Sequence, residues 1–314
     1  MCRQTAEETI AAMCSTMELR TVRSPRTIRF YREELATVVK VLRSGGRHTL
    51  PWEIDEEDVR WLLGHYIEEG LTVSTRRGYI SALKTWTEWY GNHAIIAMRI
   101  RWPTDMRPTV DWLTEDEARR LLELRMTPAQ ALVVHCELCL GMRRIEVLRL
   151  RTDSLHPEER CIEILGKGPQ GGKPRLMPYH RDTEAVVGRY LEMRGHLVAL
   201  SETADPSWPT PDTLLVWSRG GRVMEYAPKG SGIDAMLQPL GAQLGRRIGN
   251  HTLRRTFGRM MYQSGVEVAT ISRMMGHEST EQTLKYIGVN LDMMSDAMRQ
   301  FKLRGGVTDE CYGC

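Results

Sequence analysis

The chain has 314 residues, of which 41% are hydrophobic and 26% are charged, a composition typical of a folded globular protein. Its 43 lysines and arginines against 40 aspartates and glutamates give a net charge of +3, which neither requires nor excludes a nucleic-acid partner. Acidic residues interrupt the N-terminal segment where a signal peptide would lie, and no apolar run approaches the roughly 20 residues of a membrane span. With seven cysteines and no secretory signal, we expect reduced thiols, a cytoplasmic protein and no membrane partner.

The N-terminal region, residues 1–98, is predicted to be a helical domain. Helix starts are expected near residue 5, at the cap-and-proline pair Ser24-Pro25, at the capping residue Asp55 and at Ser74. Apolar residues at helical spacing follow each of these starts, so the four helices can share a core of their own.

Basic residues are concentrated in the second of these helices and its approach. They are Arg20, Arg23, Arg26, Arg29, Arg32, Lys40, Arg43 and Arg47, against two acidic residues. Such a face is either a solvated helix surface or a place where a polyanion is held. We expect phosphate contacts that position DNA without reading its sequence. The candidate residues are Arg26, Arg29, Arg76 and Arg77.

Residues 99–111, with two prolines and three arginines, are predicted to be a basic linker to a second domain at 112–290. Capping boxes at Thr114 and Thr127 start its first two helices. Strands are expected at residues 161–165 and 175–178, joined by a Gly- and Lys-rich loop, with a third at 214–217. Further helices are expected at 182–200, 231–244, 251–264, 266–275 and 279–288. The fold class is therefore mainly α with a small antiparallel β-sheet (α+β).

Four short motifs in the second domain carry reactive side chains: G-M-R-R-I-E, the hairpin G-K-G, H-T-L-R-R-T-F, and G-H followed by a helix ending in K-Y. The candidate residues are Arg143, Glu146, Lys167, His251, Arg254, His277 and Tyr286. This excess of cations over one carboxylate favours an anionic transition state, and phosphoryl transfer is the commonest such reaction.

The chemistry follows from the residue types. Two arginines can hold the non-bridging oxygens of a phosphodiester by paired hydrogen bonds. A tyrosine phenol is a credible nucleophile when cations stabilise its phenolate, and a hairpin lysine can protonate the leaving oxygen. Since no cluster of acidic residues with metal spacing accompanies the motifs, we expect neither a metal nor another cofactor.

In their order and spacing the motifs resemble those of the tyrosine recombinases of the phage integrase and Xer family. The resemblance covers residues 141–286, and the helical N-terminal region resembles the family's core-binding domain more loosely. It implies a site-specific DNA recombinase in which Tyr286 attacks a DNA phosphate, forms a 3′-phosphotyrosyl bond and frees a 5′-hydroxyl. Strands would be exchanged through a Holliday junction without metal or ATP.

The resemblance also implies a role for each residue. Arg143, Arg254 and His277 would hold the phosphate and His251 would assist proton transfer, while Glu146 fills the family's acidic position. Lys167 would protonate the leaving oxygen, with Lys173 on the same loop as the alternative. Two protomers would occupy each recombination site and four the synaptic complex, associating through a helix at 291–303 that precedes the tail of the 291–314 segment.

Other interpretations remain open at this point. A type IB topoisomerase would cut and rejoin one strand by the same chemistry, and a non-catalytic relative would only bind DNA. Four thiolates from Cys136, Cys139, Cys311 and Cys314 are enough for zinc. However, Cys136 and Cys139 lie among apolar residues and are expected in the core.

Overall fold

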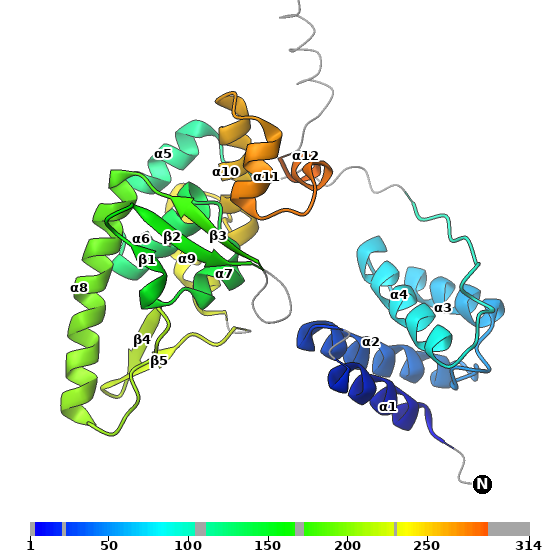
Figure 1. Ribbon diagram of the computed structural model, residues 1–314. Helices are drawn as coiled ribbons and strands as arrows, with labels where there is room; N and C mark the ends of the chain where they lie inside the picture. Colours follow the sequence, from blue (N-terminus) through cyan, green and yellow to red (C-terminus); the bar gives the residue numbers. More distant parts are fainter. Residues whose placement is uncertain (1–3, 21–22, 104–110, 167–172, 229–230, 288–314) are drawn as a thin grey trace, which may run out of the picture. The chain divides into compact units, whose positions relative to one another are not determined.

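The computed structural model describes residues 4–20, 23–103, 111–166, 173–228 and 231–287 (Figure 1). It divides the chain into two compact units, an N-terminal one that holds helices α1 to α4 and a C-terminal one that holds α5 to α12. Each unit has its own cluster of buried apolar residues. None of the helices within these ranges is long and apolar enough to cross a membrane.

The N-terminal unit consists of four helices whose starts follow local capping rules. They are α1 (Ala6–Leu19), α2 (Pro25–Ser44), α3 (Glu56–Glu68) and α4 (Val73–Trp89). Ser24 and Asp55 cap α2 and α3 as predicted. The predicted start at Ser74 is wrong by two residues, because Thr72 accepts the hydrogen bond from the N–H of Thr75 and thereby caps α4.

In the C-terminal unit, helices pack around small β-sheets (Figure 1). Its helices are α5 (Glu115–Glu123), α6 (Pro128–Val134), η1 (His135–Cys139), α7 (Arg144–Arg149), η2 (Thr152–Ser154), α8 (Arg181–Ala204), α9 (Gly232–Leu244), α10 (Asn250–Gln263), α11 (Val268–Met275) and α12 (Thr280–Ile287). Its strands are β1 (Leu155–His156), β2 (Cys161–Leu165), β3 (Pro174–Pro178), β4 (Val216–Arg219) and β5 (Arg222–Glu225).

The predicted hairpin is present, and a third strand is found two residues later than predicted, at Val216–Arg219, but it does not join the sheet of the hairpin. Strand β2 pairs antiparallel with β3 in the register Cys161↔Pro178, and the other neighbour of β2 is the two-residue strand β1. The 214–217 segment instead begins a separate two-stranded sheet, β4–β5, whose turn is formed by Gly220 and Gly221 at positive φ. Two adjacent glycines in this conformation favour a tight hairpin, which explains why this segment pairs locally.

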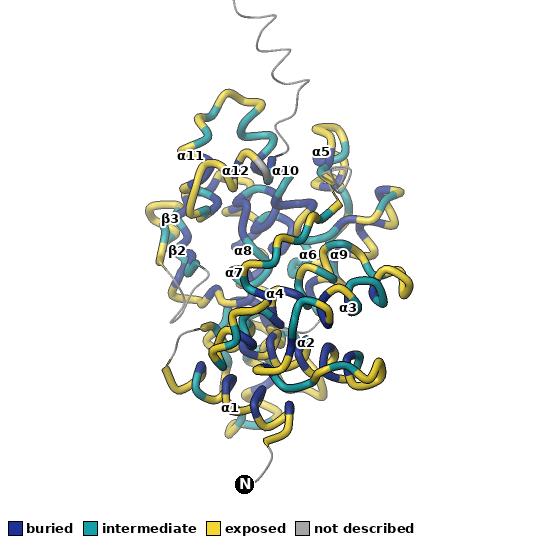
Figure 2. Tube along the Cα trace, turned by 90° about the vertical axis from the view of Figure 1, so that its right-hand side faces the viewer, coloured by how far each residue is buried: buried dark blue, intermediate teal, exposed yellow. Residues whose placement is uncertain are grey.

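The core of the C-terminal unit is formed by the inward faces of its helices and of strands β2 and β3. The buried residues in Figure 2 (dark blue) lie along the inner sides of the helices in both units, whereas the outer sides are exposed. Cys136 is fully buried in this core, and its pKa is raised by that burial. The predicted mainly helical α+β class is confirmed.

Helix α6 continues directly into one turn of π-helix, η1, immediately before the first polar motif. The N–H of Leu140 donates to the carbonyl of His135, five residues earlier, at 3.0 Å. Gly141 follows at φ 60°, and a Cβ there would lie 2.3 Å from the Phe257 ring. Only glycine fits this turn, which leads the chain from η1 into α7.

Candidate active site

Three arginines surround one buried carboxylate, that of Glu146 on helix α7. Its Oε1 accepts hydrogen bonds from Arg143 at 2.9 Å and from Arg175 at 3.1 Å, and its Oε2 accepts from Arg175 at 2.8 Å. Burial raises the pKa of Glu146, but the hydrogen bonds and charge of Arg175 outweigh this and leave the pKa below its ordinary value. Glu146 is thus ionised at neutral pH and orients both guanidinium groups.

The spacing of Arg143 and Glu146 has a local structural use as well. Arg143 occupies the N-cap position of α7, and its backbone N–H donates to Glu146 Oε2 at 2.8 Å. The same carboxylate therefore caps the helix and holds the Arg143 side chain, which is 23% exposed. The i,i+3 relation predicted from the sequence is confirmed, and the carboxylate is the buried partner.

The carbonyl groups at the C-terminal end of α11 receive arginine N–H groups from three other elements. Arg143 donates to the carbonyls of Met275 and Gly276, and Arg254 of α10 donates to that of Met275. Arg175 of β3 donates to the carbonyl of Met274 at 2.9 Å. Because these last carbonyls have no partner within the helix, the arginines satisfy them and complement the negative end of the helix dipole. Gly276 ends the helix at φ 60°, as predicted.

Arg254 and His277 form a second, more deeply buried pair. Arg254 is only 2% exposed, lies 3.7 Å from Glu146 and donates to His277 Nε2 at 3.0 Å. Since a guanidinium only donates hydrogen bonds, Nε2 accepts and the ring proton sits on Nδ1, 2.8 Å from Thr283 Oγ1. Burial and the charge of Arg254 lower the pKa of His277 to about 3, so the ring is neutral at physiological pH.

Tyr286, on helix α12, lies against this cluster. Its hydroxyl is 3.2 Å from His251 Nδ1, and its ring meets the His277 ring edge-on at a centroid distance of 5.3 Å. The guanidinium carbons of Arg254 and Arg255 lie 5.8 and 5.3 Å from the ring centroid. Burial raises the pKa of Tyr286, while these two arginines act in the opposite direction.

The predicted residues Arg143, Glu146, His251, Arg254, His277 and Tyr286 are therefore neighbours in space. Lys167 lies outside the described residues, as do the helix predicted at 291–303 and the terminal cysteines. Lys173 is described, and it is exposed just before β3. No group of three or more potential metal ligands occurs around Tyr286 within the described ranges.

Two arginines of this cluster were not predicted from the sequence. Arg175 shares the inward face of β3 with the buried Met177, so strand alternation was the available signal. Arg255 lies four residues after His251, which places both on one helix face. Its buried Nε has no hydrogen-bond partner among the described residues, and its guanidinium carbon lies 5.3 Å from the centroid of the Tyr286 ring.

The four candidate DNA-contact arginines lie on two neighbouring helices of the N-terminal unit. Arg26 and Arg29 are exposed at the start of α2, and Arg77 is exposed near the start of α4, whereas Arg76 is partly buried. The two helix starts are adjacent, since a Cβ at Gly78 would lie 3.4 Å from the ring of Phe30. Across the described part of the chain, none of the four arginines forms an ion pair with a carboxylate.

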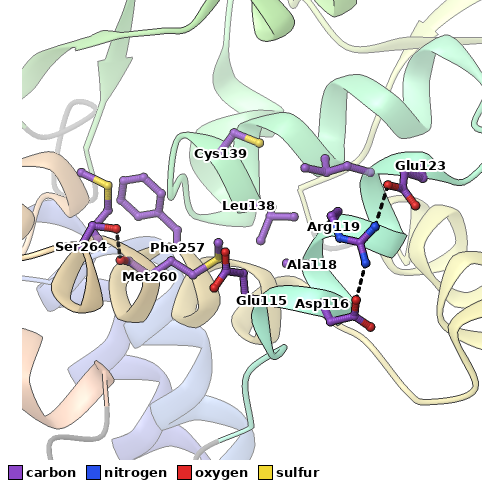
Figure 3. Close-up of a pocket in the computed structure, with 12 residues that line it drawn as sticks. Glu115, Asp116, Ala118, Arg119, Glu123, Leu138, Cys139, Phe257, Met260 and Ser264 are labelled. Carbon is purple, nitrogen blue, oxygen red and sulfur yellow. Dashed lines mark hydrogen bonds and ion pairs between the residues drawn. The ribbon is translucent and has the colours of Figure 1, made fainter.

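The C-terminal unit also has a pocket whose lining does not include the Tyr286 cluster. It is an apolar groove of about 810 Å³ between α5, η1 and α10 (Figure 3). Its floor includes Leu138 and Phe257, and Leu122 on its wall is 41% exposed. Its acidic rim consists of Glu115, Asp116 and Glu123, of which the last two pair with Arg119.

Comparison with known proteins agrees with this arrangement. Residues 111–292 match the model of the phage integrase family, and residues 7–90 match the phage integrase N-terminal SAM-like domain. Similar proteins include tyrosine recombinase XerC of Corynebacterium efficiens, 24% identical over 93% of this chain and 90% of the relative. Tyrosine recombinase XerD of Oceanobacillus iheyensis is 22% identical over 90% of this chain and 93% of the relative.

Solved structures share the fold. The XerH site-specific recombinase bound to palindromic difH substrate superimposes with a TM-score of 0.65 at 18% identity, covering 93% of this chain and 94% of that one. The Tn1549 transposon integrase in complex with transposon right-end DNA gives a TM-score of 0.67 at 16% identity, covering 95% and 99%. The chain belongs to the phage integrase family and is a tyrosine recombinase, which confirms the class predicted from the sequence.

Proposed function

We propose that this chain is a site-specific recombinase that cuts and rejoins DNA through a covalent bond to Tyr286. The observation that carries the proposal is the position of Tyr286: its hydroxyl lies 3.2 Å from His251 Nδ1, and the guanidinium carbons of Arg254 and Arg255 lie 5.8 and 5.3 Å from its ring centroid. In the proposed step, the phenolic oxygen attacks a backbone phosphorus. A 3′-phosphotyrosyl bond forms and the bond to the 5′ oxygen breaks. The reverse attack by a 5′-hydroxyl of a partner duplex completes strand exchange through a Holliday junction.

Arg143 and Arg254 are proposed to hold the non-bridging phosphate oxygens. Charge on these oxygens grows in the transition state, so cations fixed in place stabilise it more than the ground state. Glu146 and the carbonyls at the end of α11 fix both side chains. His277 contributes by accepting a hydrogen bond from Arg254, since its Nε2 carries no proton.

Proton transfer requires a base for the phenol and an acid for the leaving 5′ oxygen. His251 is proposed as the base, because its Nδ1 faces the phenol, and burial together with Arg255 lowers its pKa so that it is neutral at pH 7. Lys167 is proposed as the acid, with Lys173 as the alternative on the same loop. The proposed step needs no metal, cofactor or nucleotide, because the phosphotyrosyl bond conserves the energy of the phosphodiester bond that is broken.

The N-terminal unit is proposed to hold the duplex by its backbone. Arg26, Arg29 and Arg77 offer exposed guanidinium groups on adjacent helix starts without a carboxylate partner among the described residues. Contacts of this kind make binding strongly dependent on salt. Replacing all three by glutamine should weaken binding to any duplex and flatten the salt dependence, which an electrophoretic mobility assay at several salt concentrations measures.

We further propose that two protomers bind each site and four form the synapse in the cytoplasm, associating through residues 291–303. This segment has apolar residues at helical spacing, and Arg299, Lys302 and Arg304 lie at its end or just beyond. The apolar groove between α5, η1 and α10 is proposed as the place where this segment of a neighbouring protomer docks (Figure 3). Deletion of 291–314 or Leu122→Asp should each abolish higher complexes on DNA in size-exclusion chromatography while binding of one protomer persists. Retention of these complexes by both variants would contradict this assembly.

Covalent capture tests the catalytic proposal on duplexes of random sequence, so the target site does not have to be defined first. A pool of nicked duplexes with a randomised central sequence is incubated with the protein, and covalent adducts are isolated after denaturation and sequenced. We expect adducts with the wild type and none with Tyr286→Phe, which should still bind the recovered duplex. Adducts of equal yield with Tyr286→Phe would reject the nucleophile. Relaxation of a plasmid lacking paired sites, with no recombinant product, would indicate the topoisomerase alternative, and binding without any adduct would indicate the non-catalytic one.

A further inference from the structure

Arg175 is held far more firmly than a surface arginine on a hairpin. Its side chain is 14% exposed, and its NH1 and NH2 groups donate to the two oxygens of Glu146 at 3.1 and 2.8 Å. Its Nε donates to the carbonyl of Met274 at 2.9 Å. This paired geometry matches a carboxylate in a way that lysine cannot reproduce. Arg175 thus connects strand β3 to both α7 and α11.

The carboxylate that Arg175 binds is also the one that holds Arg143. Glu146 Oε1 lies between the NH1 groups of the two arginines, at 2.9 Å from Arg143 and 3.1 Å from Arg175. Gly276 permits this approach, because a Cβ there would lie 3.0 Å from Arg175 NH1 and 3.5 Å from Arg143 NH1. The two guanidinium groups are therefore packed side by side against one turn of the chain.

We propose that Arg175 is a positioning residue for the phosphate-binding arginines, acting through Glu146; this rests on the function proposed above. Arg175 satisfies the carboxylate from the hairpin side, so that Arg143 needs to supply only one side-chain N–H to it. Without Arg175, two acceptor sites of a buried carboxylate lose their donors, which is costly. Arg143, which already donates to Oε1, and Arg254, 3.7 Å from Oε2, are then the nearest cations to the unsatisfied oxygens. They would be drawn further onto the carboxylate and away from the positions in which they hold the phosphate.

The proposal predicts a specific defect in cleavage. On a duplex recovered by covalent capture, Arg175→Ala should form adduct about a hundredfold more slowly than the wild type at saturating DNA, while the affinity for the duplex changes little. Arg175→Lys should fall between the two, because it keeps the charge without the paired geometry. Arg222→Ala is the matched control, since Arg222 also pairs with a carboxylate (Asp205, at 2.8 Å) from a hairpin but at the separate β4–β5 sheet. It should cleave as the wild type does.

A substrate with a neutral methylphosphonate at the scissile position separates positioning from a general structural role. The missing charge on the non-bridging oxygen removes the need for the arginines, so the ratio of wild-type to Arg175→Ala rates should shrink to within about threefold. Arg143→Ala should show the same suppression. Equal losses on both substrates, or wild-type cleavage of the phosphodiester by Arg175→Ala, would overturn the proposal. If Tyr286→Phe forms adduct on the same duplex, it is the proposed function that fails, independently of Arg175.

Discussion

Removal of the Glu146 carboxylate should strongly destabilise the C-terminal unit. Glu146 is 1% exposed and is the buried anion shared by Arg143 and Arg175, with Arg254 3.7 Å away. Breaking a buried ion pair by deleting one partner costs about 3–5 kcal/mol. For a unit of this size, each kcal/mol lowers the melting temperature by about 2–4 °C, so Glu146→Ala should melt roughly 6–20 °C lower.

An added anion should reverse part of this loss. Sulfate binding at a hundred times its dissociation constant would stabilise the folded state by about 2.7 kcal/mol. Thermal unfolding by circular dichroism in chloride and in sulfate, at equal ionic strength, measures both effects. The matched control is Glu7→Ala, which removes an exposed ion pair with Arg43 of 2.7 Å and should cost at most about 1 kcal/mol. If the free energy of unfolding of Glu146→Ala in chloride lies within about 1 kcal/mol of the wild-type value, the idea that Glu146 stabilises the unit by neutralising the buried arginines is refuted.

Three further changes have defined outcomes. Arg255→Met should raise the pH of half-maximal cleavage, since one of the cations that lower the Tyr286 pKa is lost. Adduct formation at pH 7 should slow roughly tenfold, which corresponds to about 1.4 kcal/mol. Arg255→Lys, which keeps the charge, should retain the wild-type pH profile. Glu137 is buried without a hydrogen-bond partner among the described residues, and burial raises its pKa well above the ordinary value. In the folded protein Glu137 therefore keeps its proton at pH values where the unfolded chain has lost it, so the free energy of unfolding falls as pH rises above about 4.3. Glu137→Gln removes this loss, so the difference in free energy of unfolding between this variant and the wild type, measured in urea, should grow from about pH 4 to pH 8. A difference that does not change with pH would contradict this. Gly141→Ala should destabilise by about 1–3 kcal/mol in the same assay, because the new Cβ meets the Phe257 ring at positive φ, and an unchanged midpoint would show that the ring yields freely.

Helix starts were predictable from the sequence because capping is a local interaction. The side chains of Thr114 and Thr127 each accept the backbone N–H three residues later, so the motif and its hydrogen bond lie within four residues. Ser74 was misleading, since Thr72, also a good capping residue, lies two positions earlier and caps the helix by accepting the N–H of Thr75. The third strand was predicted two residues too early because Leu214 and Leu215 are buried in the core. The carbonyl of Leu214 accepts a hydrogen bond from the Tyr190 hydroxyl, and strand pairing begins only at Val216.

The candidate site was predictable where its parts lie on one helix. His251 with Arg254, and Arg143 with Glu146, are i,i+3 pairs whose shared surface follows from helix geometry. The bond between Arg175 and Glu146 joins residues 29 positions apart, and only the fold of the hairpin against α7 brings them together. Likewise, the tautomer of His277 depends on a donor from another helix, so no spacing rule contains it.

The π-turn before Gly141 has a consequence for tolerated changes of chain length. Between the Thr127 cap and Leu140, η1 contains one residue more than a continuous α-helix would need to reach the same point. Deleting one residue from 135–139 would remove this extra residue, so regular α-helical turns could carry the chain to Gly141 without rotating the segment that follows. The same deletion in a continuous α-helix, such as α10, would rotate everything beyond it by about 100° and shift it by about 1.5 Å along the axis. A single-residue deletion in η1 should therefore disturb the position of Arg143 less than a deletion in a regular helix disturbs the residues beyond it.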